Sequence, residues 1–479
     1  MDDMNGNKIV SGMIWRFGEK ITAQLVSFAV SIVLARLLMP DDYGIVAIVN
    51  VFIAIAEIFV TSGFGTSLIQ KKDADDIDFS SVFWCNLIFS IMLYMALFFF
   101  ASIIANFYNM PLIAPVLRVF GLRLPIAAIN SIQNAYVSRN MDFKKFFWAT
   151  LIGTIVSAAL GITMAYMGFG VWALIAQYLS NSIIDTIVLF IIIKWRPLFV
   201  FSTERVKPLI SYGWKILATD LIGTIFNQLN SFIIGKKYSS IDLAYYTQGK
   251  KMPDLINSNI GSTLSAVLFP AMSMSGDKEQ IKKIRRKSLK IMEYIMFPMM
   301  FGLGAVADNI IILLMTDKWI EAVPYVRITC LAAIFGVLGT TLIQEVKAIG
   351  RSDVTLKMEL IKKPIILVIA IVAMKLGVKA IAWTLVINEI VIFMFNVYPV
   401  KKYIGFDVKT YLKDAVPPFI MSAVMAMIVY MIGLLINNHL VCLVIQVIVG
   451  GLIYIISSIV TRNESYIYLK KMLINKMNN

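Results

Sequence analysis

The sequence predicts an all-α integral membrane protein with about fourteen transmembrane helices. Of its 479 residues, 59% are apolar and only 15% are charged, and the mean hydropathy is +0.79. A soluble globular protein carries roughly 25% charged residues, so this chain lacks the charges for a water-facing surface. The composition therefore excludes a soluble enzyme, a disordered regulator and a secreted disulfide scaffold.

Fourteen apolar runs are long enough to cross a bilayer, which requires about 20 mostly apolar residues. Five of these runs are the most polar: the second, fourth, seventh, eighth and tenth in chain order. Hydropathy alone could miss one of them, so the charges of the loops are also used to identify the spans. In chain order the runs are 14–38, 43–70, 80–105, 112–137, 145–167, 171–194, 209–235, 242–273, 289–315, 321–346, 354–377, 379–399, 416–437 and 441–461.

The segments between these runs alternate in charge. With the N-terminus in the cytoplasm, and with residues at the ends of the runs counted with the adjoining loops, the cytoplasmic segments hold 28 Lys and Arg residues and the opposite segments hold six. Because cations accumulate in cytoplasmic loops, this split predicts an even number of spans with both termini in the cytoplasm. It also accounts for the net charge of +15 without a nucleic-acid partner. All eight tryptophans fall near predicted span ends, where indole rings prefer the membrane interface.

Two parts of the chain echo each other at an offset of about 200 residues. Six spans per copy is an even number, so both copies would insert in the same orientation. The predicted organisation is a six-helix lobe over 1–200, a second six-helix lobe over 201–402, and two additional helices with a basic cytoplasmic tail over 403–479. A central cavity is expected between the lobes. The echoed positions are Ser31, Arg36, Tyr43, Gly44 and Arg123 with Ser231, Lys236, Leu243, Ala244 and Arg327.

Charged and amide residues inside the predicted spans recur at helical spacing. Such residues are costly in a bilayer and usually face a cavity or a partner. They either hold the bundle together through interhelical bonds or, as we favour for the set, line a water-filled cavity. Its cations would suit an anionic substrate, and a guanidinium suits phosphate oxygens well. The predicted anion-binding residues are Arg16, Lys20, Arg118, Arg123, Lys215, Lys250, Lys251 and Arg327, and the predicted polar lining is Asn130, Asn134, Asn227 and Asn257.

Five acids lie within the predicted spans and are candidates for coupling transport to H⁺ or Na⁺. A carboxylate removed from water can bind and release such an ion during transport. No metal or other cofactor is expected, because the single histidine, His439, excludes paired-His zinc sites and the three cysteines show no metal spacing. The candidate coupling residues are Glu57, Asp185, Asp220, Glu345 and Glu389.

The motifs of ATP-driven transporters and of membrane enzymes do not occur in the sequence. There is no G-x-x-x-x-G-K-[ST] loop, and each predicted extracytoplasmic loop is about ten residues or shorter. We therefore expect neither a nucleotide site nor an enzyme. The basic run Lys278–Lys290 is predicted to be a surface helix that contacts anionic lipids, with docking of a cytoplasmic glycosyltransferase as the alternative.

Four short motifs resemble those of bacterial polysaccharide flippases. Ala35–Gly44 looks like the family's "ARLL-P-D-G" hairpin, and Asn230–Gly249 looks like its mid-chain hairpin. Leu313–Val326 is similar to its "G-x-K-W-x-x-A-V-P" loop, and Ala348–Ser352 is similar to its "A-x-G-R" turn. The chain departs from the family at Asn230, where Asp is common, which leaves an ion-coupling role there in doubt. A second departure is Leu243-Ala244, where Leu-Gly is common.

The resemblance covers nearly the whole chain and is closest to Wzx-type lipopolysaccharide, O-antigen and exopolysaccharide flippases of the multidrug/oligosaccharidyl-lipid/polysaccharide exporter superfamily. It implies an undecaprenyl-diphosphate-linked oligosaccharide as substrate, turned outward across the bacterial cytoplasmic membrane by alternating access of two lobes. The expected partners are this substrate, membrane lipids and the glycosyltransferases or polymerase of the same pathway. Three alternatives stay open: a drug/cation antiporter of the same superfamily, a non-transporting scaffold for polysaccharide synthesis, and a membrane polymerase.

Overall fold

The computed structural model describes residues 2–71, 73–140, 142–275, 278–349 and 351–477, and over these ranges it contains α-helices, one 3-10 helix and no strand. The predicted all-α class is confirmed. The chain divides into two compact units, Met1–Ala244 and Tyr245–Asn479.

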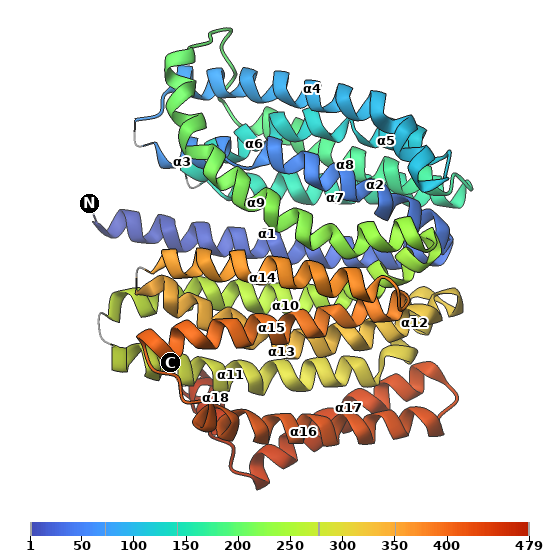
Figure 1. The fold of residues 1–479 in the computed structure, drawn as a ribbon, viewed down its shortest axis with the longest axis vertical. Coiled ribbons are helices and arrows are strands. Elements are labelled where there is room, and N and C mark those ends of the chain that lie inside the picture. Colours follow the sequence, from blue (N-terminus) through green and yellow to red (C-terminus); the bar gives the residue numbers. More distant parts are fainter. Residues whose placement is uncertain (1, 72, 141, 276–277, 350, 478–479) are drawn as a thin grey trace. The chain divides into compact units, whose positions relative to one another are not determined.

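The first unit consists of long helices whose apolar faces pack against one another. Helices α7 and α8 lie side by side, and α1 packs along α7 (Figure 1). The helices are α1 (Asp2–Leu37), α2 (Pro40–Thr61), α3 (Phe64–Gln70), α4 (Asp76–Tyr108), α5 (Ile113–Phe120), α6 (Arg123–Arg139), α7 (Lys144–Tyr166), α8 (Val171–Ile192), α9 (Thr203–Lys237) and the start of α10 (Ser240–Ser275).

The second unit also consists of long helices that pack against one another. Helix α13 packs against α11 and α15, and α16 and α17 lie side by side (Figure 1). Beyond α10, the helices are α11 (Lys278–Ala305), α12 (Ala307–Met315), the 3-10 helix η1 (Asp317–Ala322), α13 (Val323–Ala348), α14 (Ser352–Ala373), α15 (Val378–Tyr403), α16 (Val408–Leu435), α17 (His439–Val460) and α18 (Glu464–Met477).

Helices cover all fourteen predicted spans. Ten segments of the described residues are long and apolar enough to cross a membrane, and the bent pair α11–α12 makes eleven. The predicted spans that fall outside this set correspond to α9, α10 and α14, which carry more polar residues. The shortest of the three, α14, has 22 residues and extends about 33 Å, against a hydrocarbon core of about 30 Å. The multi-pass architecture is confirmed, and the count of fourteen stays a prediction.

Three spans predicted as continuous are broken in the structure. The run 43–70 divides between α2 and α3 at Gly63, whose φ of +91° favours glycine. The run 112–137 divides between α5 and α6, directly before Arg123. The run 289–315 bends by 66° at Val306, between α11 and α12. The first two breaks matter for function, because they position side chains of the candidate site.

The basic run Lys278–Lys290 is not a separate surface helix, so that prediction was wrong. Helix α11 continues without a break from Lys278 to Ala305, into the bilayer-crossing segment. Arg285 is only 8% exposed, because it donates to Glu345 of α13 and to the carbonyl of Gly405 after α15. Part of the basic run therefore faces the protein interior.

The two hairpins that echo each other in the sequence have matching helix boundaries. The turn between α1 and α2 covers residues 38–39, and the turn between α9 and α10 covers residues 238–239, an offset of 200. In each turn an aspartate three residues into the following helix accepts a hydrogen bond from the preceding backbone amide. The distances are 3.0 Å for Asp42 and 3.2 Å for Asp242. These carboxylates satisfy amides that a helix start would leave unpaired.

The two hairpin turns meet at Gly44, and this contact yields a stability prediction. A Cβ at Gly44 would lie 2.0 Å from the carbonyl oxygen of Ser240, whereas a Cβ at Gly223 would meet nothing within 4 Å. Gly44→Ala should lower the thermal unfolding midpoint, because overpacking costs about 1–3 kcal/mol. The matched control Gly223→Ala should raise it slightly, because alanine favours a helix over glycine. An unchanged midpoint for Gly44→Ala would contradict the close approach of the two turns.

Candidate functional site

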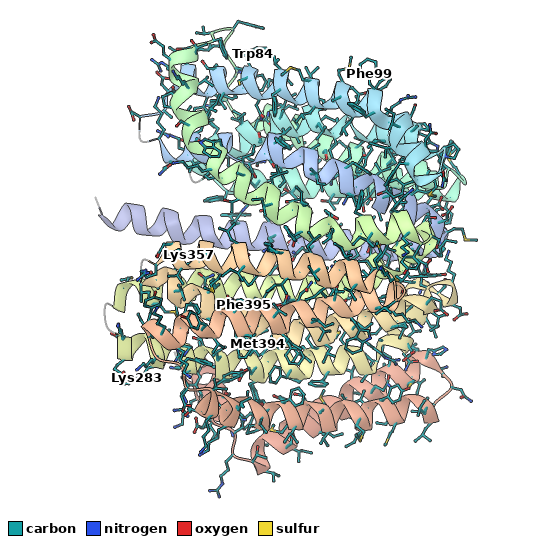
Figure 2. The ribbon with its side chains drawn as sticks, in the orientation of Figure 1. Trp84, Phe99, Lys283, Lys357, Met394 and Phe395 are labelled. Atoms are coloured by element: carbon teal, nitrogen blue, oxygen red, sulfur yellow. The ribbon has the colours of Figure 1, made fainter. Side chains whose placement is uncertain are left out.

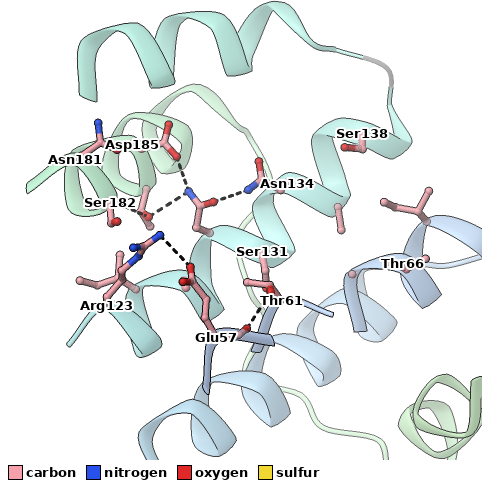
Figure 3. Close-up of a pocket in the computed structure, with 17 residues that line it drawn as sticks. Glu57, Thr61, Thr66, Arg123, Ser131, Asn134, Ser138, Asn181, Ser182 and Asp185 are labelled. Carbon is pink, nitrogen blue, oxygen red and sulfur yellow. Dashed lines mark hydrogen bonds and ion pairs between the residues drawn. The ribbon is translucent and has the colours of Figure 1, made fainter. Parts of the chain in front are cut away.

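A polar cavity of about 410 Å³ lies within the first unit, between α2, α3, α6 and α8 (Figure 3). The breaks at Gly63 and before Arg123 place the start of α3 and the start of α6 at its edge. Its polar lining consists of Glu57, Thr61, Thr66, Arg123, Asn130, Ser131, Asn134, Ser138, Asn181, Ser182, Asp185 and Thr186.

An ion pair between α2 and α6 lies at one side of this cavity. The guanidinium of Arg123 is 3.3 Å from the carboxylate of Glu57 (Figure 3). It also lies over the ring of Phe120. The two charged side chains are 28% and 24% exposed, so water and a ligand can reach both. A guanidinium has five N–H donors, so Arg123 can hold Glu57 and a second anion together.

An amide network connects α6 to α8 across the same cavity. The side-chain amide of Asn130 donates to Asp185 at 2.9 Å and to Thr186 at 3.2 Å, and Asn134 donates in turn to Asn130 (Figure 3). The second carboxylate oxygen of Asp185 is buried and has no hydrogen-bond partner in the described part of the chain. A buried oxygen without a partner can accept a proton or a small cation.

The structure brings together five of the residues predicted from the sequence. Arg123, Asn130 and Asn134 lie on one face of α6, and Glu57 and Asp185 face them from α2 and α8. This cavity holds two carboxylates and one guanidinium. The sequence predicts a cation-rich site, and this cavity is not rich in cations.

The other predicted cations of the first unit lie elsewhere. Arg118 donates to the carbonyl of Phe98 and to Ser102, so it holds α5 against α4. Arg16 pairs with Glu19 at 2.8 Å on α1. The remaining two are exposed, Lys20 on α1 and Lys215 on α9.

The predicted cations of the second unit also have local partners. Lys250 lies 3.8 Å from Asp254, one helical turn further along α10. Arg327 pairs with Asp308 and donates to the carbonyl of Gly304. Lys251 is half-buried on α10.

The three acids outside the cavity are in different environments. Glu345 is fully buried and accepts a 2.8 Å hydrogen bond from Arg285. Asp220 accepts a hydrogen bond of the same length from Ser62. The carboxylate of Glu389 packs against Gly336 of α13. Of the predicted polar lining, Asn227 is exposed and Asn257 is half-buried.

Sequence reasoning missed most of the contribution of α8. Asn181, Ser182 and Thr186 line the cavity beside Asp185. These four residues share one face of α8, because the pairs 181/185 and 182/186 are each about one helical turn apart. That spacing was available in the sequence and would have identified the whole polar face.

Comparison with known proteins identifies the family. Residues 33–324, more than half of the chain, match the family described as "Polysaccharide biosynthesis protein". The chain belongs to this family.

Relatives of this chain align over most of its length. It is 24% identical to the succinoglycan biosynthesis transport protein ExoT of Rhizobium meliloti (strain 1021), covering 96% of this chain and 94% of that protein. It is 23% identical to the lipopolysaccharide biosynthesis protein WzxC of Escherichia coli (strain K12), covering 90% and 89%. The resemblance to polysaccharide flippases is confirmed.

Solved structures share the fold of this chain. The lipid II flippase MurJ, in an inward closed conformation, superimposes with a TM-score of 0.77 at 17% identity, covering 94% of this chain and 99% of MurJ. An inward-facing multidrug resistance MATE family transporter superimposes with a TM-score of 0.62 at 16% identity, covering 81% and 98%. At this identity the likeness establishes the fold alone.

Proposed function

We propose that this protein is a flippase that moves an undecaprenyl-diphosphate-linked oligosaccharide, a polysaccharide repeat unit, from the inner to the outer leaflet of the bacterial cytoplasmic membrane. The proposal rests on the position of Arg123, which forms an ion pair with Glu57 at the edge of a polar cavity. The chain is also a member of the polysaccharide biosynthesis family. The relative ExoT is named a transport protein, and MurJ is named a flippase, which supports transport rather than catalysis.

In this proposal Arg123 binds the diphosphate of the substrate. A guanidinium forms paired hydrogen bonds with phosphate oxygens, and Glu57 keeps it oriented while the cavity is empty. The amides and hydroxyls of α6 and α8 contact sugar hydroxyls. Asp185, with its unpaired oxygen, binds the coupling H⁺ or Na⁺.

The proposal includes alternating access of two six-helix lobes, 1–200 and 201–402, with 403–479 as an added helical pair. Both termini are cytoplasmic, because cations concentrate in the segments on that side. Glycosyltransferases or the polymerase of the same pathway supply and consume the substrate, and membrane lipids surround the protein.

A drug/cation antiporter is the second candidate, and one observation favours it. The cavity carries two carboxylates against one guanidinium, a balance that attracts cations. This candidate predicts that cells lacking the protein retain a cationic dye, with unchanged surface glycan. The flippase predicts the reverse pattern.

The deciding experiment depletes the protein in its native cell and follows lipid-linked oligosaccharides by mass spectrometry. An impermeant probe reports which leaflet holds them. Complete repeat units should accumulate on the inner leaflet, because synthesis continues while translocation stops. A normal lipid pool with normal surface glycan would contradict flipping. Loss of synthesis itself, without accumulation, would indicate a scaffold.

A further inference from the structure

A second cavity in the first unit is lined by apolar residues. It has a volume of about 480 Å³ and lies between α4, α9 and the break between α2 and α3. We call it the α4–α9 groove, and its lining includes Phe59, Cys85, Ile88, Phe89, Ile210 and Trp214. The hydroxyl of Ser62, which also lines it, donates to Asp220 and is therefore already satisfied.

Two glycines fix the base of this groove. A Cβ at Gly63 would lie 2.8 Å from the carbonyl oxygen of Gly213, so the backbones of α9 and of the α2–α3 break are in direct contact. The groove is therefore part of the packing of α9 on the rest of the first unit. Whatever fills it supports the position of α9.

Trp84, which is labelled in Figure 2, lies in the same half of α4 as the groove residues Cys85 and Ile88. The indole of Trp84 donates to the carbonyl of Leu198 at 2.8 Å and stacks on Phe199, in the segment that leads into α9. Tryptophan prefers the membrane interface, and the loop charges predict that this end is cytoplasmic. The groove therefore extends from the predicted cytoplasmic interface into the inner leaflet.

The face of α9 that lines the groove also carries a cation. Ile210, Trp214 and Leu217 of α9 line it at spacings of four and three residues, which place them on one helical face. Lys207 occupies the same face one turn earlier, toward the predicted cytoplasmic end, and is exposed. An apolar groove that leads to a lysine matches the two parts of an anionic lipid, because cations near the surface attract acidic head groups.

We propose that the α4–α9 groove binds one hydrocarbon chain of an anionic phospholipid of the inner leaflet, with the lipid phosphate at Lys207. The chain would fill the space between α4 and α9, and the head group would neutralise the lysine. This binding site is separate from the polar cavity and does not depend on the proposed transport activity.

Native mass spectrometry of the purified full chain tests the proposal. The protein is released from nanodiscs of either phosphatidylglycerol or phosphatidylcholine, two lipids with the same acyl chains. The mass spectrum then gives the number of lipid molecules that stay bound to each protein. One phosphatidylglycerol should be retained about fivefold more than phosphatidylcholine, the effect expected of a single surface cation. Lys207→Gln should abolish this preference. The matched control Lys194→Gln, at another exposed cytoplasmic-side lysine, should leave it intact.

A variant that fills the groove tests the position of the lipid's hydrocarbon chain. Cys85→Phe should remove retention of both lipids, because the ring occupies the space of the chain. If Cys85→Phe does not fold, the lipid preference of Lys207→Gln alone tests the proposal. Equal retention of both lipids by the unaltered protein would overturn the proposal, as would an unchanged preference in Lys207→Gln. Displacement of the lipid by undecaprenyl phosphate at a lower concentration than by phosphatidylglycerol would also overturn it and assign the groove to the substrate's carrier chain.

Discussion

Arg123→Gln is expected to abolish export of the lipid-linked oligosaccharide while leaving the amount of protein in the membrane unchanged. Arg123 is the only cation among the described residues that line the polar cavity. Its removal leaves the substrate diphosphate without a counter-charge and leaves Glu57 unpaired. Losing the paired charge-assisted hydrogen bonds to the diphosphate costs about 1.5–3 kcal/mol each, so transport should fall about 100-fold or more. The measurement is the inner-leaflet accumulation of complete repeat units in cells that carry only the variant.

The protein should still fold, because both side chains of the Arg123–Glu57 pair are partly exposed and the remaining carboxylate can be hydrated. Lys194→Gln removes one positive charge from an exposed position outside the cavity and should export normally. Arg123→Lys keeps the charge but loses the planar fork, so we expect partial export. Normal export by Arg123→Gln would refute the assignment of this cavity to the diphosphate. A cation antiporter would instead keep its dye efflux in this variant.

Helical periodicity made part of this site predictable. Arg123, Asn130 and Asn134 are seven and four residues apart, so any α-helix over this segment places them on one face. Their partners could not be found in the same way. Glu57 belongs to α2 and Asp185 to α8, and only the packing of these helices around α6 brings the two carboxylates to the cavity.

The role of an embedded charge was less predictable than its position in a helix. Arg118 and Arg123 are five residues apart and look equivalent in the sequence. The break between α5 and α6 separates them, so Arg118 bonds to α4 while Arg123 faces the cavity. A hydropathy window averages over such a break. The all-α, multi-pass class, by contrast, depends on long apolar runs, which tolerate this averaging.

Glu345→Ala is expected to destabilise the second unit strongly, because Glu345 forms a buried ion pair. Its carboxylate is fully buried and accepts a 2.8 Å hydrogen bond from Arg285, which is 8% exposed. The guanidinium also donates to the carbonyl of Gly405, so it ties α11 to α13 and to the segment after α15. Removing one partner of a buried pair costs about 3–5 kcal/mol, because the other charge stays buried without compensation. Thermal unfolding of the purified protein measures this loss.

The double variant Arg285→Met/Glu345→Leu separates a structural role for Glu345 from ion coupling. Apolar residues of similar size can replace a buried ion pair at little cost, so the double variant should recover most of the stability that Glu345→Ala loses. If the pair is structural, the double variant also exports substrate. If Glu345 instead binds the coupling ion, the double variant folds but does not export, and the structural role is contradicted. Arg351→Met provides the comparison for an exposed pair: Arg351 and Asp353 are 41% and 52% exposed, so the loss of this pair should leave the thermal unfolding midpoint nearly unchanged. The polar cavity with Asp185 lies in the first unit. Export by the Arg285→Met/Glu345→Leu variant would therefore also decide whether an acid of the second unit acts as a coupling site beside Asp185.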